Sequence, residues 1–228
     1  MRHHSTTRRA AILATVAAPF LSVKAKAQAQ GGDAWPNRPV RVVVPWPPGG
    51  GADTTARMIF PKLAQKLGQP FVIENRPGAS GSIGAAEVAR ATPDGYTLLH
   101  DATPLAINPF LIRVSFDALA DLKAVFLPMQ VPMLLVMNPN QPPKSLAEVI
   151  ALAKARPGSL DWASSGNGSA QHLALELFTR AAGITVNHVP YRGGGPALTD
   201  VVAGQVGYFF SNSNVSLPFV QGGRVRAV

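Results

Sequence analysis

Short apolar runs alternate with segments of helical periodicity along most of this chain. Apolar positions in the runs are consecutive, and Gly, Pro or Asn follows many of them. This alternation predicts strands followed by helices, the pattern of an α/β sheet. The predicted strands lie at 39–45, 70–74, 96–100, 133–137, 161–164, 186–190 and 206–210, with a further one beginning at 225–228. The segment 112–130 is less regular, and we interpret it as a crossover between two domains.

Helices are predicted where apolar residues recur about every 3.6 positions. Ser145 and Glu148 have the spacing of a capping box, which predicts a helix start at Ser145. Asp53 is a candidate N-cap, and Pro196 is expected at the first position of its helix. Pro61 lies inside a helical segment and is expected to kink it. The predicted helices lie at 53–67, 83–91, 145–155, 170–182 and 196–203.

The first 29 residues have the order of an export signal. Basic residues precede an apolar run at 10–23, and small residues alternate at 24–29 as in a cleavage site. The run is shorter than the roughly 20 residues that a transmembrane helix requires. Arg8 and Arg9 match a twin-arginine signal in part, so both that route and the general secretory route remain open. We expect cleavage of 1–29 and a periplasmic protein.

Composition narrows the possible functions. The chain carries 21 Lys and Arg against 12 Asp and Glu, a formal charge of +9, but five of the basic residues lie within 1–29 and leave +4. No run of five basic residues remains, so nucleic-acid binding is not expected. The chain has no Cys, which excludes a disulfide scaffold, Cys-ligated metal sites and thiol catalysis.

Four glycine-rich segments each follow a predicted strand and precede a predicted helix. They lie at 46–53, 75–82, 165–169 and 191–196. Glycine allows close backbone approach, and the first N–H groups of a helix are unpaired and carry partial positive charge. Such turns are candidate anion-binding sites at the carboxyl ends of the strands, although each can also be a plain tight connection. Two turns in each half of the chain predict a cleft between two lobes.

The sequence gives less support to nucleotide binding, metal binding and nucleophilic catalysis than to anion binding at these turns. No turn has the Gly-Lys-Ser/Thr of a phosphate loop, Gln171 replaces the third glycine of a dinucleotide fingerprint, and no nucleophile elbow occurs. His172 and Glu176 have the spacing of half a metal site, or of an ordinary helix pair. Ser169 and His172 can form a dyad, but no paired acid is evident. We expect no catalysis, cofactor or metal, and retain a Ser/His hydrolase as an alternative.

The motifs resemble the periplasmic receptors of tripartite tricarboxylate transporters, also called the Bug family. The resemblance is carried by PVRVVVPWPPGGGAD, VIENRPGASGSIG and PDGYTLL in the first half, and by WASSGNGSAQHLALELF and VPYRGGGPALTDVVAGQV in the second. It implies an α/β fold of the type II periplasmic binding protein kind, with two α/β lobes that close on a ligand. It divides the chain into lobe 1 at 30–131 and lobe 2 at 132–228.

The resemblance also implies a function and a set of binding residues. Family ligands are mostly small carboxylates, held by backbone amides and water. The expected partners are the membrane subunits of such a transporter or a sensor kinase, and we expect a monomer. The positions that match the binding loops are Trp46, Gly49, Gly50, Asp53, Ala79, Ser80, Gly81, Ala102, Thr103, Ser165, Gly168, Ser169, His172, Tyr191, Arg192 and Gly193.

Three departures from the family pattern are visible. Trp46 replaces the usual Phe in the pocket wall. Asp101 lies in a segment that is usually richer in Ser and Gly, and it disfavours an anion if it faces the cleft. Family members also continue beyond the position of Val228 and return to lobe 1, so we expect this chain to be a fragment whose lobe 1 lacks its return segment.

Overall fold

The computed structural model describes residues 34–228, and the predicted export signal at 1–29 lies outside them. Residues 35–228 group into one compact unit that contains two separate sheets. We call each sheet with its helices a lobe; the boundaries predicted for the lobes stay a prediction. No helix in the described part combines the length and the apolar character needed to cross a bilayer.

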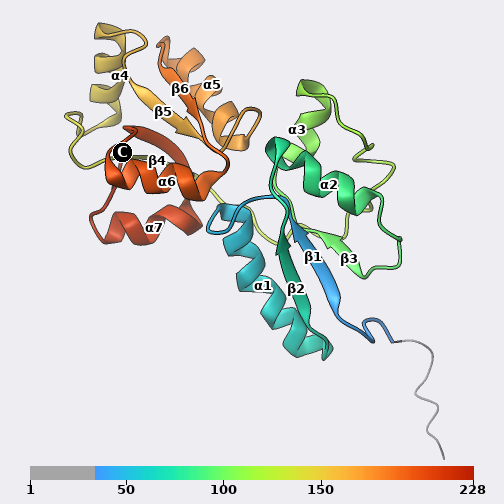
Figure 1. Ribbon diagram of the computed structural model, residues 1–228. Helices are drawn as coiled ribbons and strands as arrows, with labels where there is room; N and C mark the ends of the chain where they lie inside the picture. Colours follow the sequence, from blue (N-terminus) through green and yellow to red (C-terminus); the bar gives the residue numbers. More distant parts are fainter. Residues whose placement is uncertain (1–33) are drawn as a thin grey trace, which may run out of the picture. The chain divides into compact units, whose positions relative to one another are not determined.

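The first lobe is built on a parallel sheet of three strands in the order β2-β1-β3. Its helices α1 and α2 cover opposite faces (Figure 1). Val42 and Val44 of β1 pack with Phe60 of α1, whereas Leu99 of β3 packs with Ala85 of α2. The elements are β1 (Val40–Val44), α1 (Gly51–Leu67), β2 (Phe71–Asn75), α2 (Ser82–Ala89), β3 (Thr97–Leu99) and α3 (Pro104–Leu111).

The second lobe is built on a five-stranded sheet in the order β6-β5-β7-β4-β8. The strands β5, β6 and β7 are parallel, and β4 is antiparallel to both of its neighbours. The elements are β4 (Met133–Met137), α4 (Leu146–Ala155), β5 (Asp161–Ser164), α5 (Ala170–Ala182), β6 (Asn187–Pro190), α6 (Gly194–Ala203), β7 (Tyr208–Asn212), α7 (Ser213–Gln221) and β8 (Arg226–Ala227).

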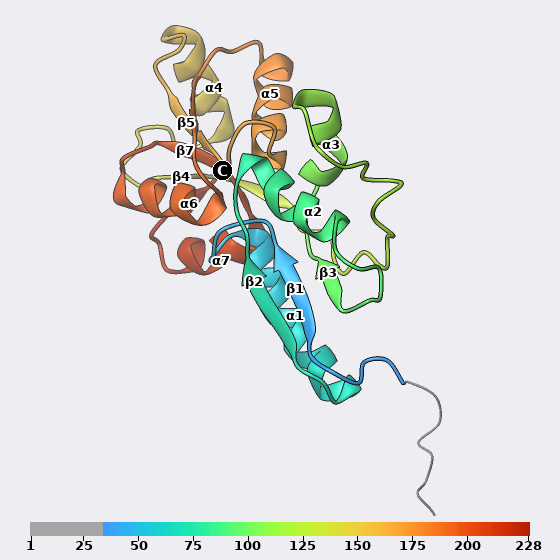
Figure 2. The same cartoon turned by 45° about the vertical axis from the view of Figure 1, so that its right-hand side comes forward.

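The core of the second lobe has two layers because side chains alternate across each strand. Trp162 of β5 and Tyr208 of β7 stack with ring centroids 5.1 Å apart, and they pack with residues of α4 and α5. The next residues along, Ala163 and Phe209, pack on the opposite face with α6 and α7. Figure 2 shows the two helix pairs on either side of this sheet.

Most predicted elements are confirmed within two residues, and the caps explain several of them. Ser145 Oγ accepts a hydrogen bond from Glu148 N at 3.3 Å and opens α4, as predicted. Glycines at 68 and 183 end α1 and α5 in the left-handed conformation. The segment 112–130 contains no helix or strand, which agrees with its irregular pattern.

Two expectations about helix starts were wrong, and one strand is displaced by two residues. The N-cap of α1 is Gly50, so Asp53 lies inside the first turn instead of preceding the helix. Helix α6 begins at Gly194, which makes Pro196 its third residue and not its first. Strand β7 begins at Tyr208, two residues later than predicted. Gly51 in α1, and Gly194 and Gly195 in α6, belong to the helices, so both helices begin two residues earlier than predicted, and neither has a side-chain cap hydrogen bond.

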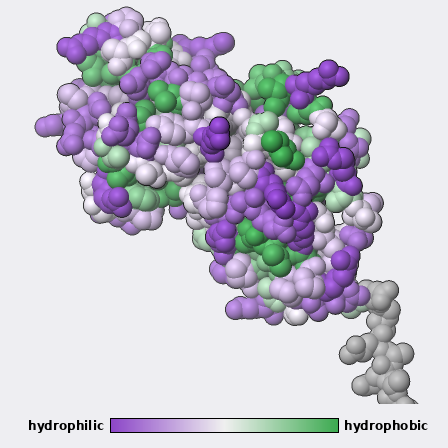
Figure 3. All heavy atoms as spheres, viewed as in Figure 1, coloured by the Kyte–Doolittle hydropathy of each residue, from purple (hydrophilic) through white to green (hydrophobic). Residues whose placement is uncertain are grey.

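Two helices were not predicted. Thr103 and Pro104 at the start of α3, and Asn212 before α7, are start signals that the sequence analysis overlooked. Each helix also contains a proline, Pro109 or Pro218, and neither has a side-chain cap hydrogen bond. Helix α3 also carries much exposed apolar surface (Figure 3): the exposed fraction of Phe110 is 87%.

Candidate ligand-binding site

Each of the four glycine-rich turns connects the carboxyl end of a parallel strand to the start of a helix. We name them turn 1 (46–50, β1 to α1), turn 2 (76–81, β2 to α2), turn 3 (165–169, β5 to α5) and turn 4 (191–193, β6 to α6). Because β1 pairs with β2 and β5 pairs with β6, each lobe presents two turns at one edge of its sheet. This is the edge at which open α/β sheets bind ligands.

The backbone of these turns uses conformations that favour glycine. The φ angles of Gly49, Gly78 and Gly193 are +80°, +139° and +131°. Turn 2 is unusual because two residues with side chains, Ala79 and Ser80, also have positive φ angles of 45° and 51°. Positions of this kind cost free energy and concentrate at functional sites.

Turn 1 of the first lobe lies against turn 4 of the second. A Cβ atom at Gly193 would lie 2.7 Å from Pro47 Cδ and closer still to Pro47 Cγ. A Cβ atom at Gly195, in the first turn of α6, would lie 3.0 Å from Pro48 O. The starts of α1 and α6 therefore approach each other at a distance that only glycine permits.

Turn 2 lies against turn 3 in the same way. Ser80 Oγ donates a short hydrogen bond to Asn167 O. Asn108 of α3 donates from Nδ2 to Ser80 O at 2.8 Å and to Ser82 Oγ at 2.9 Å, and this buried amide fixes turn 2 from behind. The four turns thus form two facing pairs, each with one member from either lobe.

Asp53 is a structural anchor of turn 1. It is 2% exposed, and its carboxylate accepts hydrogen bonds from Gly49 N at 2.9 Å, Arg57 Nε at 3.0 Å and Asn75 Nδ2 at 2.9 Å. Burial alone raises the pKa of Asp53, but the bonds from Arg57, Gly49 and Asn75 outweigh it and hold the pKa below its usual value. With these partners in place, Asp53 orders the turn; the direct ligand contact that the resemblance implies stays a prediction.

Trp46 and Gly81 lie beside the carboxyl group of Asp101. Trp46 Nε1 and Ala102 N each donate to Asp101 Oδ1 at 2.7 Å. A Cβ atom at Gly81 would lie 3.5 Å from both carboxyl oxygens, so the absence of a side chain there leaves that side of the carboxyl open. Burial raises the pKa of Asp101 to about 7, although both hydrogen bonds lower it.

In the second lobe, Ser165 presents an unsatisfied hydroxyl to the start of α6. Its residue is 6% exposed, and its Oγ is buried without a hydrogen-bond partner in the described part of the chain. A Cβ atom at Gly194 would lie 3.2 Å from this oxygen. A buried hydroxyl without a partner is costly unless a water or ligand satisfies it.

Turn 3 is held by the residues of the suggested dyad. Ser169 Oγ accepts from His172 N at 3.2 Å as the N-cap of α5, and Gly168 N donates to His172 Nδ1 at 3.2 Å. The other ring nitrogen, Nε2, lies 3.6 Å from Glu176 Oε1, as expected for a pair four residues apart. Neither ring nitrogen faces Ser169 Oγ, so this arrangement counts against a Ser/His nucleophile. The His172 ring instead stacks on His188 with centroids 4.2 Å apart.

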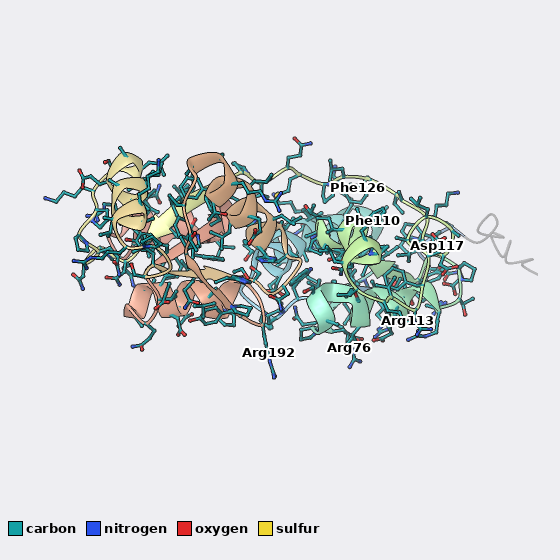
Figure 4. The ribbon with its side chains drawn as sticks, turned by 90° about the horizontal axis from the view of Figure 1, so that it is seen from above. Arg76, Phe110, Arg113, Asp117, Phe126 and Arg192 are labelled. Carbon is teal, nitrogen blue, oxygen red and sulfur yellow. The ribbon has the colours of Figure 1, made fainter. Side chains whose placement is uncertain are left out.

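The remaining predicted positions are more exposed. Ala102 and Thr103 are exposed after β3. Tyr191 OH donates to Asp200 Oδ2 at 2.8 Å; burial, with Asp200 beside it, raises the pKa of Tyr191 to about 12. Arg192 is exposed and points away from the ribbon (Figure 4), so its guanidinium does not lie among the turns.

Two cavities flank the facing turns. One of about 540 Å³ is lined by Pro48 and Gly49 of turn 1 and by Tyr191 and Gly195 near turn 4. Another of about 710 Å³ lies between α3 and α5, where Asn108 and His172 contribute to its lining. Both volumes are in the range of small-molecule sites.

Several polar residues of the site escaped the sequence analysis. Asn214 Nδ2 in α7 donates to Gly51 O at 3.3 Å and to Thr55 Oγ1 at 3.2 Å, which links α7 to α1. Gln171 Nε2 donates to Asn212 Oδ1 at 2.6 Å, and Asn212 lies beside Gly51 at the start of α1. The sequence signal that could have identified them is an amide side chain, Asn or Gln, within or beside an apolar segment.

Comparison with known proteins gives concordant matches. A family model described as the tripartite tricarboxylate transporter family receptor matches residues 55–228. Protein BugT of Bordetella pertussis is 39% identical over 212 residues, which cover 92% of this chain and 65% of BugT. This chain therefore spans less than two thirds of the length of that relative.

Solved structures agree with these matches. A Rhodopseudomonas palustris protein solved with adipate is 36% identical, with a TM-score of 0.83 over 86% of this chain and 66% of that protein. MatC of the same organism, solved with bound malate, is 35% identical, with a TM-score of 0.77 over 85% of this chain and 66% of that protein.

Proposed function

This chain belongs to the family of tripartite tricarboxylate transporter receptors, and we propose that it serves as a periplasmic receptor for a small carboxylate. The ligand is captured between the two lobes and presented to the membrane subunits of such a transporter. The role involves no catalysis. The proposal includes export through the leader at 1–29 and action as a monomer.

The observation that carries the proposal is the convergence of the helix starts of α1, α2, α5 and α6 in two facing pairs of turns. Each start offers unpaired backbone N–H groups and the positive end of a helix dipole. A carboxylate placed between facing turns receives donors from both lobes. Relatives solved with adipate and malate support a carboxylate as the ligand.

Ligand entry requires the facing turns to separate and then close again. Hinge closure of two lobes around a ligand is a common response in binding proteins. Ser165 supports the proposal because its buried hydroxyl has no hydrogen-bond partner among residues 34–228 and lies beside the start of α6. A carboxylate oxygen at this position would satisfy it.

A thermal-shift panel tests the proposal. Mono-, di- and tricarboxylates, amino acids and aromatic acids are each added to the full chain, with the matching neutral amides as controls. A ligand at 100 times its Kd stabilises the folded state by about 2.7 kcal/mol, so at least one acid should raise the melting temperature. If no acid stabilises the protein and none is retained in native mass spectrometry, the receptor proposal fails.

Two further measurements separate this role from the alternatives. The bound acid should be recovered unchanged after prolonged incubation, whereas a hydrolase acting through Ser169 would yield product. Pull-downs with transporter membrane subunits and with the periplasmic domain of a sensor kinase decide between transport and signalling. Capture of the sensor domain alone would contradict the transport role.

A further inference from the structure

Asp101 carries a half-buried carboxyl group beside the glycine-rich turns of the first lobe. It follows β3 at the ligand-facing edge of the first sheet, beside turns 1 and 2. Both hydrogen bonds it receives, from Trp46 Nε1 and Ala102 N, end on Oδ1. Among residues 34–228, no Lys, Arg or His forms a salt bridge with it.

The second oxygen of this carboxyl group is available. No hydrogen bond to Oδ2 occurs within the described part of the chain, and both oxygens lie 3.5 Å from the position that a Gly81 Cβ would take. Gly81 is the N-cap of α2 and has a φ of +93°. The Asp101 carboxyl therefore lies beside the helix start that would otherwise receive a ligand carboxylate.

This placement changes what the first lobe can accept. An ionised carboxylate repels an anion and attracts a hydrogen-bond donor or a cation. The starts of α5 and α6 in the second lobe have no comparable acid in their first turns. The site thus carries a hydrogen-bond acceptor beside the start of α2, in addition to the backbone donors at the helix starts of both lobes.

We propose that Asp101 determines specificity by accepting a hydrogen bond from a hydroxyl or ammonium group of the ligand. The preferred ligands are then hydroxy- or amino-substituted carboxylates instead of unsubstituted dicarboxylates. This inference rests on the proposed receptor function. The pKa of about 7 supports it, because a donor from the ligand would stabilise the ionised form that burial disfavours.

Succinate, malate and aspartate provide a matched test. They share four carbons and two carboxylates and differ in carrying hydrogen, hydroxyl or ammonium at one carbon. Calorimetric titration of the full chain at pH 8 should show malate or aspartate binding at least about tenfold more tightly than succinate, a difference worth about 1.4 kcal/mol. In Asp101→Asn this preference should fall at least about fivefold. Asp117→Asn, which changes an exposed aspartate, is the matched control and should retain the preference.

The outcomes separate the two proposals. If the acids bind but the wild-type chain does not prefer malate or aspartate, or if Asp101→Asn keeps the preference, the specificity inference is overturned and the receptor function stands. If no carboxylate in the wider panel binds the wild-type chain, both proposals fall. If Asp101→Asn does not fold, Asp101→Ala replaces it and is judged by the same ratio of affinities. A wild-type chain that does not prefer malate or aspartate over succinate overturns the inference without any variant.

Discussion

Replacing Gly193 by alanine tests the close approach of turns 1 and 4. Gly193 has φ +131° and ψ 167°, a region that is nearly exclusive to glycine and costs other residues on the order of 1–3 kcal/mol. The added Cβ would also overlap the ring of Pro47, and overpacking costs typically about 1–3 kcal/mol. Together these effects predict a loss of about 4 kcal/mol from the free energy of unfolding.

Gly183→Ala is the matched control for this substitution. Gly183 also has a positive φ, +60°, but no atom from the described residues outside its immediate neighbours lies within 4 Å of the position its Cβ would take. Its expected cost is about 1–2 kcal/mol, from the left-handed backbone alone. Urea unfolding followed by circular dichroism measures both variants. If Gly193→Ala destabilises the protein no more than Gly183→Ala does, the described approach of the two turns is incorrect.

Three further substitutions test other parts of the account by urea unfolding. Asp53→Asn should lower the free energy of unfolding by about 2 kcal/mol at pH 7 because a buried charged hydrogen-bond acceptor is lost. Because the pKa of Asp53 is lowered, this difference between wild type and variant should disappear as the pH falls below about 4. A difference that stays constant with pH would contradict the charge argument. Ser145→Ala should cost about 1 kcal/mol through loss of the cap bond from Glu148 N, and an unchanged midpoint would show that the cap contributes nothing. The pKa of Asp101, raised to about 7, predicts that wild-type stability declines between about pH 4 and pH 7, by up to about 1.4 kcal/mol per pH unit; Asp101→Asn should lack this slope.

The elements that were predicted most accurately have strong local signals. Strand β5 and helix α5 were placed at their observed bounds because an apolar strand, a glycine turn, the Ser169 cap and a terminal Gly183 follow one another. The turn positions were predictable for the same reason, since glycine clusters mark them directly. The anion-binding character follows from these helix starts and not from Lys or Arg, as the outward position of Arg192 illustrates.

The remaining features depend on contacts between distant segments. Helices α3 and α7 contain internal prolines and have no side-chain cap, so their stability comes from packing that local pattern does not reveal. The antiparallel direction of β4 is a property of sheet topology. The Asp101 carboxyl was recognised as a departure, but its contacts with Trp46 and Gly81 join three separate elements and required the structure.

In the proposed receptor function, backbone N–H groups at the facing helix starts hold the ligand carboxylate. Calorimetric titration of the full chain with the best acid from the panel, and with the neutral amide of that acid, tests it most directly. We expect the acid to bind with a micromolar or lower Kd, a binding free energy of about 8 kcal/mol, and the amide to bind at least about a hundredfold more weakly. Equal binding of acid and amide would contradict the claim.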